Sequence, residues 1–121
     1  MTKIMLAEDD VTMLSLLKTL LRLEGFDTVT LRDDENVLEA IHRELPDAIL
    51  LDVHLNQGSG VDLLREIRSD LNLNELYVIM QSGMNVGQEC AAAGADTFLL
   101  KPYMPDTLIA AIRDGLAQRK S

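Results

Sequence analysis

The sequence is short of basic and aromatic residues, and both shortages count against nucleic-acid binding. It has 11 lysines and arginines against 20 acidic residues, a formal net charge of −9. Direct contact with nucleic acid needs a basic surface, so we expect none from this chain. The excess acid predicts an acidic surface, part of which could bind a cation. The aromatics form no series for stacking single-stranded bases: Phe26, Tyr77, Phe98 and Tyr103.

Long apolar runs and cysteine pairs are also missing. No apolar stretch approaches the roughly 20 residues that span a membrane, so we expect no membrane segment. The first residues enter a predicted strand at once, which leaves no room for a signal peptide. The single cysteine, Cys90, cannot form an internal disulfide. Together these features predict a cytoplasmic protein.

Apolar residues nevertheless make up 47% of the 121 residues, enough for a core, so disorder is not expected. No linker, low-complexity tract or internal repeat divides the chain. We therefore expect one domain over residues 1–121.

Short apolar runs alternate with segments of helical spacing. The runs predict strands at Lys3–Ala7, Phe26–Leu31, Ala48–Leu51, Leu76–Gln81 and Thr97–Leu100. The intervening segments predict helices around Met13–Leu23, Val37–Leu45, Leu63–Ile67, Met84–Ala93 and Pro105–Leu116. Asp33 or Asp34 is the expected cap of the second helix, and Ser59 with Asp62 resembles a capping box for the third. Gly87 makes the fourth helix the weakest, because glycine costs about 1 kcal/mol relative to alanine.

This β-α order, repeated five times, predicts an α/β fold. Right-handed crossovers place helices on both faces of a doubly wound parallel sheet of three layers. The expected strand order is 2-1-3-4-5, so the first and third strands are neighbours. Ligands bind such sheets at this switch point, outside the carboxyl ends of the strands.

Polar residues follow four of the predicted strands at that edge. Glu8 and Asp9 follow the first, Asp52 the third, Ser82 the fourth and Lys101 the fifth. Crowded carboxylates repel, so they either take up a proton or bind a cation, and Mg²⁺ suits such oxygen ligands. Alternatively, Asp10 is a helix cap while Glu8 and Asp9 are solvated loop residues, Lys101 extends to solvent, and Ser82 caps a helix.

Together these residues fit one reaction. A carboxylate oxygen of Asp52 attacks a phosphoryl donor, while Lys101 and a metal ion neutralise charge on the transferring group. The product is an aspartyl phosphate, and no base is placed to drive water at it.

In the order and positions of these motifs, the sequence resembles the receiver domain of two-component response regulators. The resemblance covers essentially the whole chain and includes Ala93–Asp96 before the last strand. It implies a flavodoxin-like fold and a phosphorylation switch rather than a turnover enzyme. The partners of the protein would be a sensor histidine kinase or phosphotransfer protein and an unknown downstream target or output domain. A homodimer of the chain would also be compatible with the resemblance.

The resemblance also implies roles for individual residues. Asp52 would be the phosphoacceptor. Mg²⁺, or Mn²⁺ in its place, would be held by Asp9, Asp52 and the backbone carbonyl of His54, with Glu8 acting through water. Ser82 and Phe98 would move on phosphorylation, and the Lys101-Pro102 bond would be cis.

The chain departs from the family pattern in the loops around the site. Asn56 stands where proline is usual, which predicts a looser loop after the third strand. His54 and Met84 occupy positions that can face the phosphoryl group and could modulate its lifetime. The segment between Ser82 and Lys101 is about three residues shorter than usual, almost one helical turn. An output surface on the fourth and fifth helices is therefore not expected to carry over.

Two other functions remain open from the sequence. One is a receiver-like protein-interaction module that works without phosphorylation. The other is a metal-dependent phosphatase, which ranks last because such enzymes place a second acid where this chain has His54. Residues Gln118–Ser121 follow the last predicted helix directly, so the chain is either a stand-alone receiver or part of a longer regulator.

Overall fold

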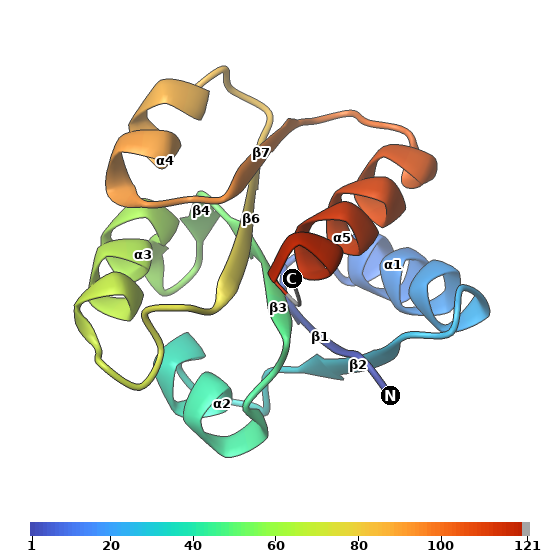
Figure 1. The fold of residues 1–121 in the computed structure, drawn as a ribbon, viewed down its shortest axis with the longest axis horizontal. Helices are drawn as coiled ribbons and strands as arrows, with labels where there is room; N and C mark the ends of the chain where they lie inside the picture. Colours follow the sequence, from blue (N-terminus) through green and yellow to red (C-terminus); the bar gives the residue numbers. More distant parts are fainter. Residues whose placement is uncertain (120–121) are drawn as a thin grey trace.

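Five parallel strands form the central sheet of the computed structural model, which describes residues 1–119 (Figure 1). Their order is β2-β1-β3-β6-β7. The strands are β1 Lys3–Ala7, β2 Asp27–Thr30, β3 Ala48–Asp52, β6 Tyr77–Ser82 and β7 Thr97–Leu100. In chain order of these five strands this is 2-1-3-4-5, so the predicted doubly wound α/β fold is confirmed.

Within residues 1–119, five helices cover the two faces of this sheet. They are α1 Val11–Leu23, α2 Val37–Glu44, α3 Gly60–Ser69, α4 Gly87–Ala93 and α5 Pro105–Arg119. Figure 1 shows α1 and α5 on one side, with α2, α3 and α4 on the other. No helix among residues 1–119 is long and apolar enough to cross a membrane.

The core is divided in two by the sheet, because successive side chains of a strand point to opposite faces. Ile49 and Leu51 of β3 pack with α2, α3 and α4, whereas Leu50 packs with α1 and α5. Every residue of β3 is buried. This two-sided burial is why residues Ala48–Leu51 of the strand form an unbroken apolar run.

Helix starts follow from side-chain caps, and one predicted cap was wrong. Asp10 accepts a hydrogen bond from the Met13 N–H at 3.0 Å, and Ser59 caps α3 as predicted. The cap of α2 is Asn36, not Asp33 or Asp34: its backbone is extended and its side-chain oxygen accepts the N–H of residue 39 at 2.8 Å. Asp34 instead has φ 62° in the preceding turn.

Helix α4 begins at Gly87, three residues later than predicted. The Met84 N–H donates to Ser82 Oγ at 3.0 Å and the Val86 N–H to the Met84 carbonyl at 2.9 Å, so this segment turns before the helix starts. Gly87 also lies against Phe98: a Cβ there would be 3.2 Å from the ring. The glycine that weakens the helix therefore lets the aromatic side chain approach it.

A short hairpin after β3 was not predicted. Strands β4 His54–Leu55 and β5 Gly58–Ser59 pair antiparallel around Asn56 and Gln57. The Gln57 side chain donates to the Glu35 carbonyl at 2.8 Å and accepts from the Val37 N–H at 3.2 Å. The hairpin is thereby attached to the start of α2.

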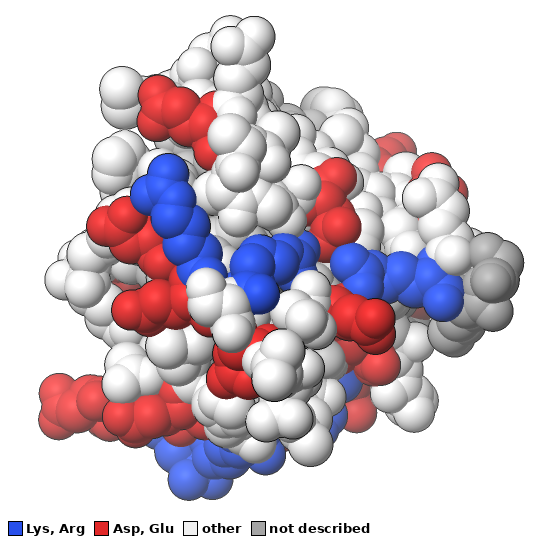
Figure 2. All heavy atoms as spheres, turned by 60° about the vertical axis from the view of Figure 1, so that its left-hand side comes forward, with Lys and Arg blue, Asp and Glu red and all other residues white. Residues whose placement is uncertain are grey.

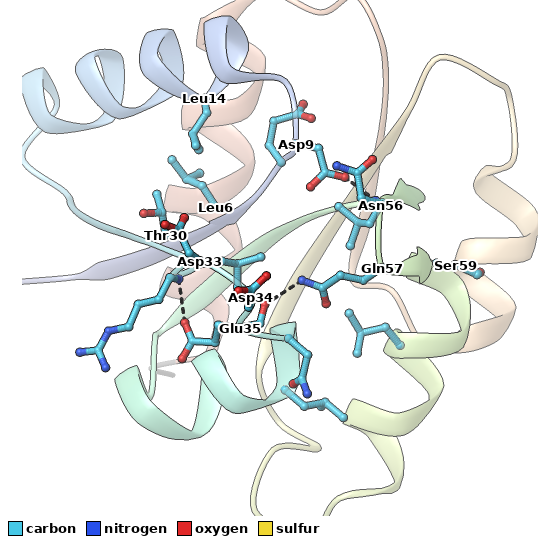
Figure 3. Close-up of a pocket in the computed structure, with 18 of the residues that line it drawn as sticks. Leu6, Asp9, Leu14, Thr30, Asp33, Asp34, Glu35, Asn56, Gln57 and Ser59 are labelled. Carbon is cyan, nitrogen blue, oxygen red and sulfur yellow. Dashed lines mark hydrogen bonds between the residues drawn. The ribbon is translucent and has the colours of Figure 1, made fainter.

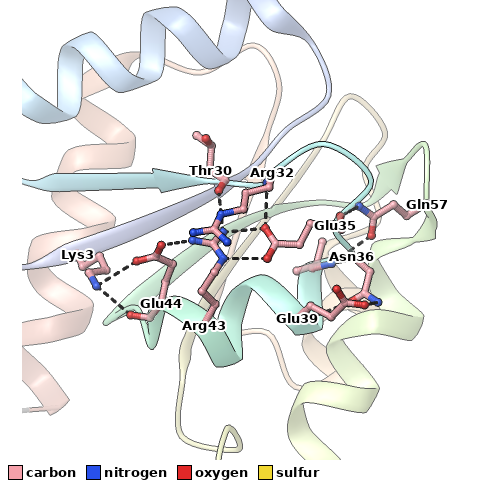
Figure 4. A network of polar contacts seen from close by, with 10 residues as sticks. Lys3, Thr30, Arg32, Glu35, Asn36, Glu39, Arg43, Glu44 and Gln57 are labelled. Carbon is pink, nitrogen blue, oxygen red and sulfur yellow. Dashed lines mark hydrogen bonds and ion pairs between the residues drawn. The ribbon is translucent and has the colours of Figure 1, made fainter.

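A polar network holds the outer side of α2 (Figure 4). Arg43 forms a two-bond pair with Glu35, at 2.7 and 2.8 Å, and also contacts Glu44. Lys3 reaches Glu44 from β1 at 3.3 Å. The bonds from Arg43 and from the Arg32 N–H lower the pKa of Glu35 to about 2.

Candidate functional site at the carboxyl edge of the sheet

The carboxyl ends of β1, β3 and β7 bring two acids and one lysine together. Lys101 Nζ lies 2.6 Å from Asp52 Oδ2 and 3.0 Å from Glu8 Oε1. Glu8 and Asp52 are both buried. Buried carboxylates need a partner charge, and the one ammonium group supplies it to both.

This arrangement keeps Lys101 charged. Burial alone would lower the pKa of Lys101, but its hydrogen bonds to Asp52 and Glu8, together with their negative charge, outweigh that effect. The pKa of Lys101 therefore lies above its usual range. Its backbone is held as well, because the Lys101 N–H donates to the Ser82 carbonyl at 2.8 Å. The Lys101-Pro102 bond is cis, as expected.

Asp9 is placed differently from the other two acids. Its Oδ2 accepts the Asn56 N–H at 2.6 Å, so the carboxylate lies against the hairpin turn (Figure 3). A proline at position 56 would have no N–H and could not make this bond. Within the part of the chain that the structure describes, no three His, Cys, Asp or Glu side chains are grouped to hold a metal.

The oxygen groups present nevertheless suit Mg²⁺, which takes one or two carboxylates and keeps several waters. Asp9 lies just after β1 and Asp52 is the last residue of β3, and these two strands are paired. Asp52 Oδ1 accepts the His54 N–H at 3.2 Å, which keeps the main chain of residue 54 close to this carboxylate. Glu8 accepts from Lys101 and, at 3.2 Å, from the Asp10 N–H, so both of its carboxylate oxygens already have a protein donor.

The remaining predicted residues surround this centre. Ser82 is buried and does not cap α4, since its hydroxyl accepts the N–H of Met84 and Val86 occupies the cap position. Phe98 is half-buried against Gly87. Met84 and His54 are exposed.

Sequence reasoning missed Gln81 and Tyr103. Gln81 is fully buried at the end of β6, where it pairs in register with Asp52. Its Nε2 donates to Glu8 at 3.2 Å, and its Oε1 accepts the Tyr103 hydroxyl at 2.5 Å. Burial, and then the charges of Glu8 and Asp52, raise the pKa of Tyr103 well above its usual range. An amide inside an apolar strand was the available signal.

Gly60 was also missed as a site residue. A Cβ at Gly60 would lie 2.1 Å from the backbone oxygen of Asp52. Its own N–H donates to the Val53 carbonyl at 2.7 Å. The start of α3 is therefore packed directly on the main chain of the candidate phosphoacceptor, and only glycine fits there.

An open hollow of about 910 Å³ adjoins the site, between the hairpin and the start of α2 (Figure 3). Glu8 and Asp9 line it, but Asp52, Ser82 and Lys101 do not. Acidic and amide side chains dominate its lining. On the face shown in Figure 2, basic side chains are interspersed with acidic ones. That face shows no basic patch of the kind that nucleic acid requires.

The model of the response regulator receiver domain family matches residues 4–113. The DNA-binding response regulator MtrA of Mycobacterium tuberculosis is 32% identical over 117 residues, which are 94% of this chain and 50% of that protein. The chain thus spans about half the length of the curated relatives it matches.

Solved structures agree with this match. A two-component response regulator from Clostridium difficile superposes with a TM-score of 0.88 at 25% identity, covering 100% of both chains. The receiver domain of the sensor histidine kinase PA1611 from Pseudomonas aeruginosa has a TM-score of 0.84 at 25% identity, covering 96% of this chain and 98% of that one. That structure has a magnesium ion coordinated in its active-site cleft.

Proposed function

The chain belongs to the response regulator receiver domain family, and from that membership we propose that Asp52 is its phosphoacceptor. The phosphoryl group would come from a sensor histidine kinase or a phosphotransfer protein. The domain would then change its affinity for a downstream protein or output domain. It assists its own phosphorylation and dephosphorylation and is not a turnover enzyme.

One observation carries this proposal: the buried Asp52 carboxylate is held 2.6 Å from the Lys101 ammonium at the switch point of the sheet. A structural ion pair would need no further acid beside it. Here Glu8 shares the same ammonium group, and Asp9 lies after the end of β1, at the same carboxyl edge of the sheet. Excess negative charge at a ligand-binding edge supports a cation site.

The reaction would be a phosphoryl transfer between two nucleophiles. An Asp52 oxygen forms a bond to phosphorus, the phosphorus–nitrogen bond of the donor phosphohistidine breaks, and the imidazole nitrogen keeps the electron pair. Lys101 stays protonated and neutralises charge on the transferring group, which is the main requirement of such a reaction. Mg²⁺, held by Asp9, Asp52 and the carbonyl of His54, would supply further charge neutralisation when bound.

Phosphorylation would act through the new charge at residue 52. A phosphoryl group adds about −1.5 to −2 charge and three strong acceptors. The Ser82 hydroxyl now accepts the Met84 N–H, and turning it toward the phosphoryl group would release that bond. Phe98 packs on the start of α4, so its inward movement would free the first turn of that helix.

A second function has a specific observation in its favour. Asp9 is engaged by the Asn56 N–H, and α4 has only 7 residues without a side-chain cap. Both features would suit a receiver-like interaction module that works without phosphorylation. The pairing of Lys101 with two buried acids favours the phosphoacceptor.

The test uses acetyl phosphate and, separately, beryllofluoride, each with Mg²⁺. We expect acetyl phosphate to add the mass of one phosphoryl group, and both reagents to shift the amide NMR signals around residues 52, 82 and 101. Asp52→Asn should abolish both effects. A wild-type chain that gains no mass and shows no shifts would support the interaction module, and steady hydrolysis of a phosphate ester would support a phosphatase.

A further inference from the structure

Gln81 links the β7–α5 loop to the carboxylate pair. Tyr103 lies in that loop, two residues after Lys101, and its hydroxyl donates to Gln81 Oε1 at 2.5 Å. The Gln81 Nε2 donates in turn to Glu8 Oε1 at 3.2 Å. The same Glu8 oxygen accepts from Lys101. A continuous series of hydrogen bonds therefore runs from the tyrosine to the ammonium group beside Asp52.

Burial restricts the orientation of the Gln81 amide in this series of hydrogen bonds. Gln81 is fully buried, and a buried amide needs partners at both of its ends. Its oxygen has Tyr103 and its nitrogen has Glu8, so the amide has one favourable orientation. If the Tyr103 hydroxyl were removed, the Gln81 oxygen would lose the hydrogen bond that fixes the orientation of the amide. The amide N–H would then no longer be held on Glu8.

We propose that Gln81 and Tyr103 are positioning residues of the phosphoacceptor site. The Tyr103 hydroxyl orients the Gln81 amide, and this amide holds Glu8 against the Lys101 ammonium. Glu8 so placed sets the share of the positive charge that Asp52 receives. The inference rests on the proposed function and adds to it a physical link between the β7–α5 loop and the reacting carboxylate.

The chain provides a matched control, because its other tyrosine lies at the opposite end of β6. The Tyr77 hydroxyl contacts Thr97 at 2.9 Å and the Ala111 carbonyl at 3.1 Å, far along the strand from Gln81. Tyr103→Phe and Tyr77→Phe each delete one bonded hydroxyl. Only the first deletion touches the site.

The experiment measures the rate of phosphorylation by acetyl phosphate with Mg²⁺. We expect Tyr103→Phe to slow it by about tenfold, the usual scale for losing a partner that orients a ligand, and Tyr77→Phe to change it less than about twofold. Gln81→Met, which keeps the length of the side chain, should reproduce the slower rate. The side-chain amide NMR signals of Gln81 should move in Tyr103→Phe but not in Tyr77→Phe.

A double variant tests the route through Glu8. If Tyr103 acts by way of Glu8, then adding Tyr103→Phe to Glu8→Gln should cost far less than tenfold. An equal cost in both backgrounds, or equal rates for the two tyrosine variants, would overturn the inference while leaving the phosphoacceptor intact. A wild-type chain that takes up no phosphoryl group would overturn the proposed function first, and the inference with it.

Discussion

Replacing Gly60 by alanine should disturb the candidate phosphoacceptor through its backbone. The new Cβ would lie 2.1 Å from the Asp52 carbonyl oxygen, whereas ordinary contacts begin near 3.4 Å. The two main chains must therefore separate by about 1.3 Å, the difference between these values. The opposing atom is main chain and cannot rotate away. We expect a loss of about 1–3 kcal/mol in the free energy of unfolding, the usual cost of overpacking.

Urea unfolding followed by circular dichroism measures this loss, with an unchanged dependence on urea concentration if the denatured state is unaffected. Gly83→Ala is the stability control, because a Cβ there meets no atom within 4 Å and its φ is not in the left-handed region. The rate of phosphorylation should fall further in Gly60→Ala than the folded fraction does, since the carboxylate moves with its backbone. Equal stability of the two alanine variants would refute the close approach.

Three further predictions address the acids and their partners. Asn56→Pro deletes the N–H that bonds Asp9 and so leaves that carboxylate free to bind Mg²⁺. The Kd for Mg²⁺ should fall by about tenfold, within the worth of a hydrogen bond to a charged group. Asn56→Ala keeps that N–H, so equal Kd values of the two variants in an NMR titration would contradict the prediction. Lys101→Met leaves two buried carboxylates without their cation and should cost roughly 2–4 kcal/mol of stability at pH 7. Urea unfolding at pH 7 measures this cost, and a variant as stable as the wild type would contradict the prediction. The pKa of Glu35 is lowered from 4.5 to about 2, so its contribution is complete above pH 4.5 and is lost as the pH falls toward 2. Glu35→Gln should therefore lose less stability than the wild type between pH 4.5 and 2, and parallel acid unfolding curves would exclude this role.

The sheet and the central pair of the site were predictable from sequence for one reason. Strands buried on both faces are unbroken apolar runs, so their ends could be located from the positions at which these runs stop in the sequence. Once the strand order was inferred, the polar residues after β1, β3 and β7 had to meet at one edge. Asp52 and Lys101 are 49 residues apart in the chain, yet topology alone predicted their proximity.

The details that were missed depend on contacts rather than on pattern. Gln81 stands in an apolar run, and its partners are 73 and 22 residues away. The role of Gly60 depends on how closely α3 approaches β3, which spacing does not encode. At the start of α2, Asn36 rather than the predicted Asp33 or Asp34 accepts the Glu39 N–H, a contact that the sequence pattern does not specify.

The hydrogen bonds of Gln57 to the start of α2 affect which substitutions this region can accept. Both of its partners, the Glu35 carbonyl and the Val37 N–H, are main-chain atoms. Mutation at positions 35 or 37 replaces side chains but leaves those atoms in place, except for proline at 37, which has no N–H. We therefore expect the attachment to survive side-chain changes at these two positions in related sequences, provided that an amide is retained at 57.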